Sequence, residues 1–160
     1  MRDDNMAQFF DIYPDGKLIS LIRDPQSWYI SAQGLDRNQY GDIEVAMRLW
    51  KESAQATIRN RQRYSHHVRI IKFESLLGKT EAVMRSLASY LNITFDNILL
   101  TPTFNRLPIK ANSSYPVQTH GIVRDPLSRH KKILNEAEID IIDRMARETY
   151  ESVLQHVAEI

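Results

Sequence analysis

Arg23 and Ser31 are the residues whose types and spacing suggest chemistry most clearly. They lie eight residues apart, the arginine directly after an apolar run and the serine inside the next segment. A guanidinium is a planar fork of N–H donors that suits a phosphate group, and a serine hydroxyl adds another donor. The pair therefore predicts an anion site with a phosphate ligand. A surface ion pair between Arg23 and Asp24 is the alternative.

The elements around this pair must bring both side chains to one place. Residues 18–22 are mostly apolar, which predicts a buried strand ending just before Arg23. Asp24 can cap a following helix, and Pro25 suits its first position, where an N–H has no partner to lose. Both side chains can then face the carboxyl edge of a sheet, where ligands of open α/β sheets bind.

Three stretches of the chain resemble one family. Ile-Arg-Asp-Pro at 22–25, followed by Ser31, resembles the 3′-phosphate-binding element of sulfotransferases that use 3′-phosphoadenosine 5′-phosphosulfate (PAPS). Residues 68–93 look like that family's segment of a strand, Tyr-Glu-x-Leu and a helix. Residues 112–134 look like its late cofactor-binding loop and the helix after it. The three occur in the family's order and cover nearly the whole chain.

The resemblance implies roles for particular residues. Arg23 and Ser31 would bind the 3′-phosphate of PAPS. Phe73 stands where the family has a tyrosine near the adenine, so its ring is retained for stacking while the polar contact is lost. A core phenylalanine that ends a strand is the alternative for this position.

The late loop completes the implied cofactor site. Ser113 and Ser114 would donate to the nucleotide, and Arg129 would supply positive charge to its phosphates. A serine-rich surface loop without a ligand is the alternative. His120 and His130 lie in the same segment and could approach a substrate, although a solvated loop histidine is the commoner outcome. No catalytic residue is assigned.

The resemblance also identifies what precedes Arg23 in the family. An N-terminal loop of the Tyr-Pro-Lys-Ser-Gly-Thr-Thr type holds the 5′-phosphosulfate, and the catalytic base follows it. The residues before Arg23 contain no such loop. We therefore expect an incomplete fold that supplies the 3′-phosphate half, with a missing N-terminal segment, a truncated gene product or a homo-oligomer as explanations.

Gly78-Lys79-Thr80 matches only the tail of a nucleotide-binding P-loop. The full pattern requires a glycine at position 73, which is Phe73, and Glu74 would place a carboxylate near the phosphates. We therefore interpret Thr80 as the cap of the next helix.

Composition limits the remaining possibilities. The 160 residues can form a single domain, 1–160, whole or partial. With 21 basic and 20 acidic side chains the net charge is +1, which does not indicate a nucleic-acid or membrane partner. Cysteine is absent, the histidines show no metal spacing, and no run reaches the roughly 18 apolar residues of a membrane span. We expect a cytoplasmic protein without a metal.

Hydrophobic spacing predicts the other elements. We expect a second strand over 68–73, loops over 34–41 and 92–118, and helices over 6–13, 42–62, 80–91 and 136–157. The resemblance to sulfotransferases implies an α/β fold for these elements. By resemblance it would be a three-layer, P-loop-kinase-like fold, helix-rich with a small parallel sheet.

The leading hypothesis is transfer of a sulfuryl group from PAPS to a hydroxyl or amine acceptor. The chief alternative is a noncatalytic helical interaction module, in which the amphipathic helices 42–62 and 136–157 form a partner face. A degenerate sulfotransferase remnant is also possible. A phosphate-sensing or kinase-like domain is a weaker hypothesis, because the P-loop pattern fails.

Overall fold

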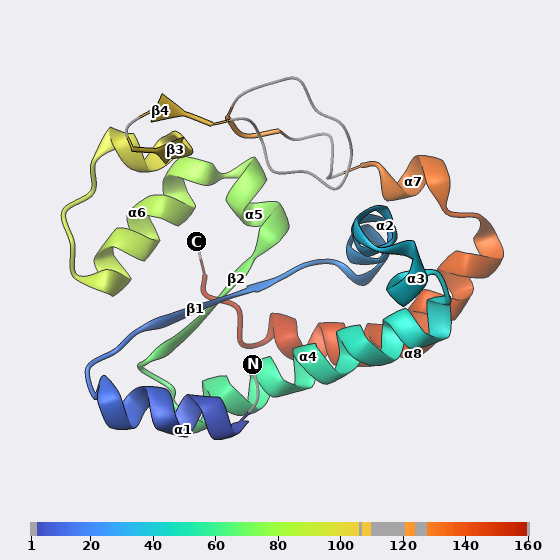
Figure 1. Cartoon of the computed structure of the whole chain (residues 1–160), viewed down its shortest axis with the longest axis horizontal. Coiled ribbons are helices and arrows are strands. Elements are labelled where there is room, and N and C mark those ends of the chain that lie inside the picture. Colours follow the sequence, from blue (N-terminus) through green and yellow to red (C-terminus); the bar gives the residue numbers. More distant parts are fainter. Residues whose placement is uncertain (1–2, 106, 110–120, 124–127, 160) are drawn as a thin grey trace.

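The computed structural model describes residues 3–105, 107–109, 121–123 and 128–159. Two parallel strands lie between helices, and two very short strands form a separate hairpin (Figure 1). In chain order the elements are α1 (Asp3–Ile12), β1 (Leu18–Ile22), α2 (Pro25–Leu35), α3 (Arg37–Tyr40), α4 (Ile43–Arg63), β2 (Val68–Lys72), α5 (Phe73–Gly78), α6 (Thr80–Leu91), the 3₁₀ helix η1 (Asn97–Leu100), β3 (Thr103–Phe104), β4 (Leu107–Pro108), α7 (His130–Ile133) and α8 (Glu136–Leu154).

The main sheet sets the geometry of the molecule. β1 and β2 pair in parallel from Leu18–Val68 to Ile22–Lys72, so their carboxyl ends lie side by side. An isolated parallel bridge joins Ile70 to Val157, and the Ala158 N–H donates to the Ile70 carbonyl. The C-terminal segment therefore extends the sheet beside β2.

The elements form three layers (Figure 1). On one face of the sheet, Ile22 and Ile70 belong to the main core with α4 and α8, which pack along each other. On the other face, Ile71 packs with Val83 and Leu87 of α6. The predicted helix-rich α/β architecture with a small parallel sheet is confirmed.

One part of the sheet is uncovered. Side chains alternate between the faces of a strand, so Ile19 and Leu21 share the face that carries Ile71 on β2. They are 41% and 53% exposed, while Ile71 is buried beneath α6. The helical layer on this face therefore covers β2 and leaves much of β1 open.

Side-chain caps explain where several helices begin. Asp24 accepts a hydrogen bond from the Ser27 N–H before α2, whose first residue is Pro25, as predicted. Asn135 and Glu138 form a reciprocal capping box at the start of α8. Asp36 accepts from the N–H groups of Asn38 and Gln39, which produces the short helix α3 where we predicted a loop.

Other predicted boundaries were wrong in detail. Phe73 opens α5 instead of ending β2, with Glu74 in the first helical turn, where a carboxylate is favourable. Thr80 does not cap α6, because its hydroxyl donates back to the Leu76 carbonyl and Lys79 occupies the cap position without a side-chain bond.

Two long segments also differ from their predictions. The helix predicted over 136–157 ends at Leu154, because the chain then bends to bring Val157 beside Ile70. The loop predicted over 92–118 contains η1, β3 and β4 within its described part. None of the described helices is long and apolar enough to cross a membrane.

Candidate functional site

The register of the sheet brings Arg23 and Phe73 together. Each directly follows its strand, and the strands end at the paired residues Ile22 and Lys72. The guanidinium carbon of Arg23 lies 4.6 Å from the centroid of the Phe73 ring. This is a cation–π distance, so the ring supports one face of the guanidinium and limits its orientation. The predicted placement of Arg23 at the carboxyl edge of β1 is therefore observed.

Glu74 ties the two strand ends to each other. Its Oε1 accepts a hydrogen bond of 3.1 Å from the backbone N–H of Asp24. The Asp24 carboxylate in turn accepts from the Ser27 N–H at 2.9 Å, which starts α2. These bonds fix the turn in which Arg23 lies, so the direction of its side chain is set by contacts far apart in sequence.

The electrostatic surroundings of Arg23 are mixed. Burial is the main cause that lowers the pKa of Arg23, and the nearby positive charge of Arg129 lowers it further. The carboxylates of Glu74 and Asp24 act in the opposite direction. Arginine stays protonated at neutral pH in spite of such shifts. The positive charge of Arg129 is therefore close enough to act on Arg23, and a bound anion would reduce the repulsion between the two charges.

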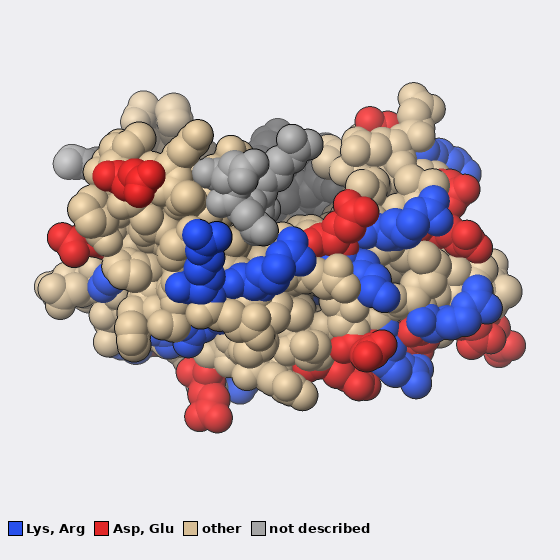
Figure 2. Space-filling view, turned by 90° about the horizontal axis from the view of Figure 1, so that it is seen from below, with Lys and Arg blue, Asp and Glu red and all other residues tan. Residues whose placement is uncertain are grey.

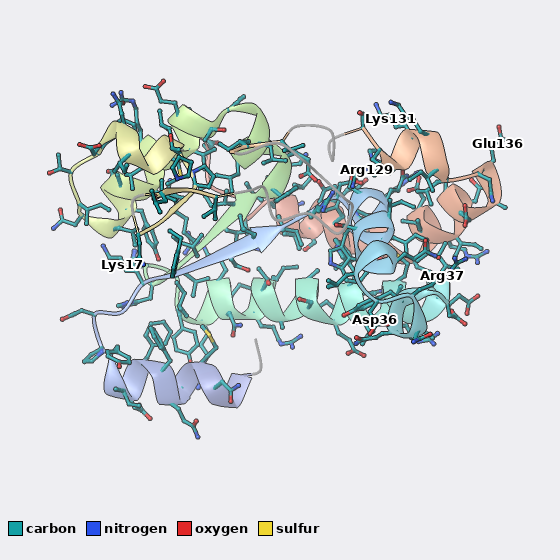
Figure 3. All side chains as sticks on the ribbon, turned by 45° about the horizontal axis from the view of Figure 1, so that its top comes forward. Lys17, Asp36, Arg37, Arg129, Lys131 and Glu136 are labelled. Carbon is teal, nitrogen blue, oxygen red and sulfur yellow. The ribbon has the colours of Figure 1, made fainter. Side chains whose placement is uncertain are left out.

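Arg129 reaches this edge through a contact between α2 and α7. The buried Ser27 hydroxyl forms a 2.8 Å hydrogen bond with Nδ1 of His130, the residue after Arg129. Figure 3 shows Arg129 beside α2, on the side from which α7 approaches. Ser31 lies one helical turn beyond Ser27, so both belong to the same face of α2. Ser31 is half-buried there.

The structure thus brings three predicted residues, Arg23, Phe73 and Arg129, to one edge of the sheet. Ser31 lies on the adjoining face of α2. Ser113 and Ser114 lie outside the described residues, so their predicted roles stay predictions. No group of three or more potential metal ligands gathers in the part of the chain that the structure describes.

Aromatic side chains form the floor beneath the Arg23 turn. The Trp50 indole N–H donates to the Arg23 carbonyl at 3.2 Å, and the Trp50 ring meets Tyr150 edge-to-face with centroids 6.0 Å apart. Burial, followed by the nearby charges of Glu74 and Asp24, raises the pKa of Tyr150. This floor excludes water from below the turn and holds its backbone in place.

Sequence reasoning missed how three groups shape the site. Ser27 and Trp50 were given no role there, and His130 was considered only as a residue near a substrate. Each acts through a contact with a residue distant in the chain. The available signal was weak: Ser27 precedes Ser31 by four residues, the separation that places two side chains on one helical face.

Two comparisons with known proteins both find similarity to sulfotransferases. A family model described as the sulfotransferase family matches residues 4–97. A solved structure, "Sulfotransferase Domain from the Curacin Biosynthetic Pathway", superposes with a TM-score of 0.57 at 21% sequence identity. The match covers 80% of this chain and 52% of the other, so this chain spans about half of that domain's length. It supports the predicted fold class. No curated protein sequence matches this chain.

Proposed function

Because the chain belongs to the sulfotransferase family, we propose that its Arg23 edge binds the 3′-phosphate of the sulfuryl donor PAPS. The observation that carries this proposal is the stacked Arg23–Phe73 pair at the joined carboxyl ends of β1 and β2. A fixed guanidinium at that edge suits a phosphate group, because arginine can donate two parallel hydrogen bonds to phosphate oxygens.

The neighbouring side chains would complete the nucleotide site. Arg129 would add a second positive charge, and the Ser31 hydroxyl would donate to a phosphate oxygen from the face of α2. The Phe73 ring would contact the adenosine by its free face or edge while its other face supports Arg23. Ser113 and Ser114 would close over the nucleotide from the late loop.

The proposed reaction transfers a sulfuryl group. The bond between sulfur and the bridging phosphate oxygen of PAPS breaks, and a bond forms between sulfur and an acceptor oxygen or nitrogen. The acceptor proton passes to a base, and 3′-phosphoadenosine 5′-phosphate leaves. In this chain the described residues at the Arg23 edge would bind and orient the donor. We propose that the donor's phosphosulfate group and the base are served by residues other than those described at the Arg23 edge.

The interaction-module hypothesis depended on exposed apolar faces of α4 and α8. Those faces supply the core instead: Ala46, Met47 and Trp50 of α4 are buried with Ile142 and Ala146 of α8. The fold therefore favours the nucleotide-binding hypothesis. A cytoplasmic location and a single domain over 1–160 stay predictions from the sequence.

Titration calorimetry with 3′-phosphoadenosine 5′-phosphate tests the proposal on the full chain. We expect saturable binding, and Arg23→Ala should weaken it by about tenfold or more, the effect of losing charge-assisted hydrogen bonds. Arg48→Ala is the matched control, because Arg48 is exposed on α4 and pairs there with Glu44. The proposal would be contradicted if millimolar nucleotide gave no heat of binding, or if the two variants weakened binding equally. The hypothesis of a degenerate sulfotransferase remnant would then remain.

A further inference from the structure

A cavity lies at the opposite end of the sheet from Arg23. Its volume is about 570 Å³, and it is bounded by the end of α4, the start of β2, Tyr90 of α6 and the C-terminal segment. Strands rise about 3.3 Å per residue, so the length of β1 and β2 places it roughly 15 Å from the Arg23 edge. It is therefore separate from the proposed nucleotide site. Its polar lining consists of Arg61, Gln62, Ser65, His66, Arg69, Tyr90, Gln155, His156 and Glu159.

The chain concentrates positive charge beside this cavity. Residues 53–73 contain five Lys and Arg side chains and no Asp or Glu, although the whole chain has 21 and 20. Figure 2 shows Lys and Arg gathered over the C-terminal half of α4, while its N-terminal half carries both signs. The net charge of the whole chain is almost neutral, but residues 53–73 carry an excess of positive charge. This local excess would attract an anionic ligand.

Contacts hold the cationic groups of this cavity in place. Arg69 Nη2 donates to the Ser86 hydroxyl at 2.7 Å, and its guanidinium carbon lies 5.4 Å from the Tyr90 ring centroid. Arg61 Nη1 donates to the Ser65 carbonyl. Lys17, which Figure 3 shows at the start of β1, has its ammonium 5.3 Å from the same Tyr90 ring. Two cations, Lys17 and Arg69, thus lie against the Tyr90 ring, and Arg61 is held nearby in the cavity lining.

These charges lack the carboxylate partners that other arginines have. Arg48, Arg85 and Arg147 each pair with a carboxylate four residues earlier. Within the described residues neither Arg61 nor Arg69 has a carboxylate within 4 Å, and Glu159 is the one acidic side chain in the cavity lining. The Nε of Arg69 is buried without a hydrogen-bond partner in the same described part. No carboxylate at ion-pair distance therefore neutralises these two guanidinium groups within the described residues.

We infer that this cavity binds the sulfate or phosphate ester group of a small molecule. Arg61 and Arg69 supply charge and planar donor groups, which match the oxygens of either ester. The amides of Gln62 and Gln155 and the imidazoles of His66 and His156 offer hydrogen bonds to an uncharged remainder. The volume lies within the usual range of about 300–1,000 Å³ for small-molecule sites and accommodates a ligand the size of a sugar ester.

The histidines provide local reporters for a test in the full chain. His66 and His156 line the cavity, while His130 contacts Ser27 near the Arg23 edge. We expect glucose 6-sulfate and glucose 6-phosphate to shift the imidazole NMR signals of His66 and His156 saturably and to leave His130 unchanged. Glucose should shift none of them. The ester that binds more tightly identifies the ligand class, whereas absent shifts, or parallel shifts of all three signals, would overturn the inference.

Two variants distinguish a specific binding site from nonspecific attraction by positive charge. Arg61→Gln should weaken ester binding by about tenfold, because it removes a positioned charged donor. Arg63→Gln removes the same charge two residues away, from an exposed position outside the cavity, and should change the affinity by less than about twofold. Equal weakening in both variants would overturn the inference, and the reporter shifts of the unmodified chain test it even if Arg61→Gln folds poorly.

The inference stands apart from the proposed function. 3′-Phosphoadenosine 5′-phosphate should act on the His130 signal, and the sugar esters should act on His66 and His156. If the sugar esters shift the His66 and His156 signals while 3′-phosphoadenosine 5′-phosphate leaves the His130 signal unchanged, the second site is supported and the first is contradicted.

Discussion

At the scale of single residues, the Arg23 edge depends on a carboxylate that would itself repel a phosphate. Glu74 accepts from the Asp24 N–H and lies close enough to Arg23 to raise its pKa, against the lowering by burial. Its second oxygen, Oε2, is buried without a hydrogen-bond partner among the described residues. We interpret Glu74 as a positioning residue, which fixes the turn after β1 so that the Arg23 side chain needs little ordering when an anion binds.

Glu74→Ala should therefore reduce stability. The Asp24 N–H would lose its acceptor in a partly buried place, which should lower the free energy of unfolding by about 1–3 kcal/mol. Urea unfolding measures this change. Glu81→Ala is the control, since Glu81 forms an exposed pair with Arg85 and should cost less than about 1 kcal/mol. Similar losses in both variants would show that Glu74 holds nothing in place.

Tyr150 predicts a pH dependence. Its raised pKa keeps the phenol protonated in the folded chain at a pH where the unfolded chain ionises it, near pH 10. This contribution to stability is complete below about pH 10 and is lost as the pH rises above that value. Burial also raises the pKa of Tyr29 and Tyr90, which act in the same direction.

Tyr150→Phe should flatten this alkaline loss. The Tyr150 hydroxyl has no hydrogen-bond partner among the described residues, so its removal should cost less than about 1 kcal/mol at pH 8. Unfolding free energies at pH 8 and pH 10.5 should then differ less in the variant than in the parent chain. Equal differences would mean that the Tyr150 phenol does not govern alkaline stability.

At the scale of elements, the residues that cap the helices help to determine where the site residues lie. Asp24 begins α2 directly after Arg23, and Asn135 begins α8, which supplies Tyr150 to the floor. Each cap satisfies N–H groups that have no partner within the helix. The position of the site residues therefore depends on two capping residues as well as on the strands.

Asn135→Ala should destabilise the whole domain. It removes the acceptor for the Glu138 N–H and half of the capping box, which should lower the free energy of unfolding by about 1 kcal/mol. Asn135→Ser is the matched control because serine keeps an acceptor at the cap, and it should change stability by only a few tenths of a kcal/mol. A loss in the serine variant as large as in the alanine variant would contradict the role of the cap.

Element boundaries were predictable where a single local cause decides them. β1 was predicted from its apolar run, and the start of α2 from Asp24 and Pro25. Phe73 was misassigned, because an aromatic residue after a β-branched run is typical of a strand, whereas the chain turns into α5 at that point. The helix α3 was missed, since Asp36 lies in a polar stretch that is equally typical of a loop.

At the scale of the whole molecule, the sequence indicated the family and the edge but not how the site is assembled. Arg23 could be identified because its neighbours in sequence explain its position. Glu74 and Asp24 meet across 50 positions of the chain, and Ser27 and His130 across 103. Such contacts follow from the parallel register and from the docking of α7 on α2, which leave no periodic pattern in the sequence.

The exposure of β1 on one face also follows from tertiary packing, which leaves no pattern in the sequence. Ile19 and Leu21 belong to an apolar run and were expected to be buried, but the helices on their face cover β2 instead. Among the described residues β1 has one hydrogen-bonded neighbour, β2, which leaves backbone groups available on its other side. The hypothesis of an incomplete sheet predicts such an open edge, and it stays a prediction.

The most direct test of the central claim compares two nucleotides and two proteins. Calorimetry would measure 3′-phosphoadenosine 5′-phosphate and adenosine 5′-phosphate, which differ by the 3′-phosphate, with the parent chain and with Arg23→Ala. We predict that the parent chain prefers the 3′-phosphorylated nucleotide by about tenfold or more and that Arg23→Ala removes most of this preference. A preference that survives in Arg23→Ala, or equal affinities in the parent chain, would contradict the assignment of Arg23 to the 3′-phosphate.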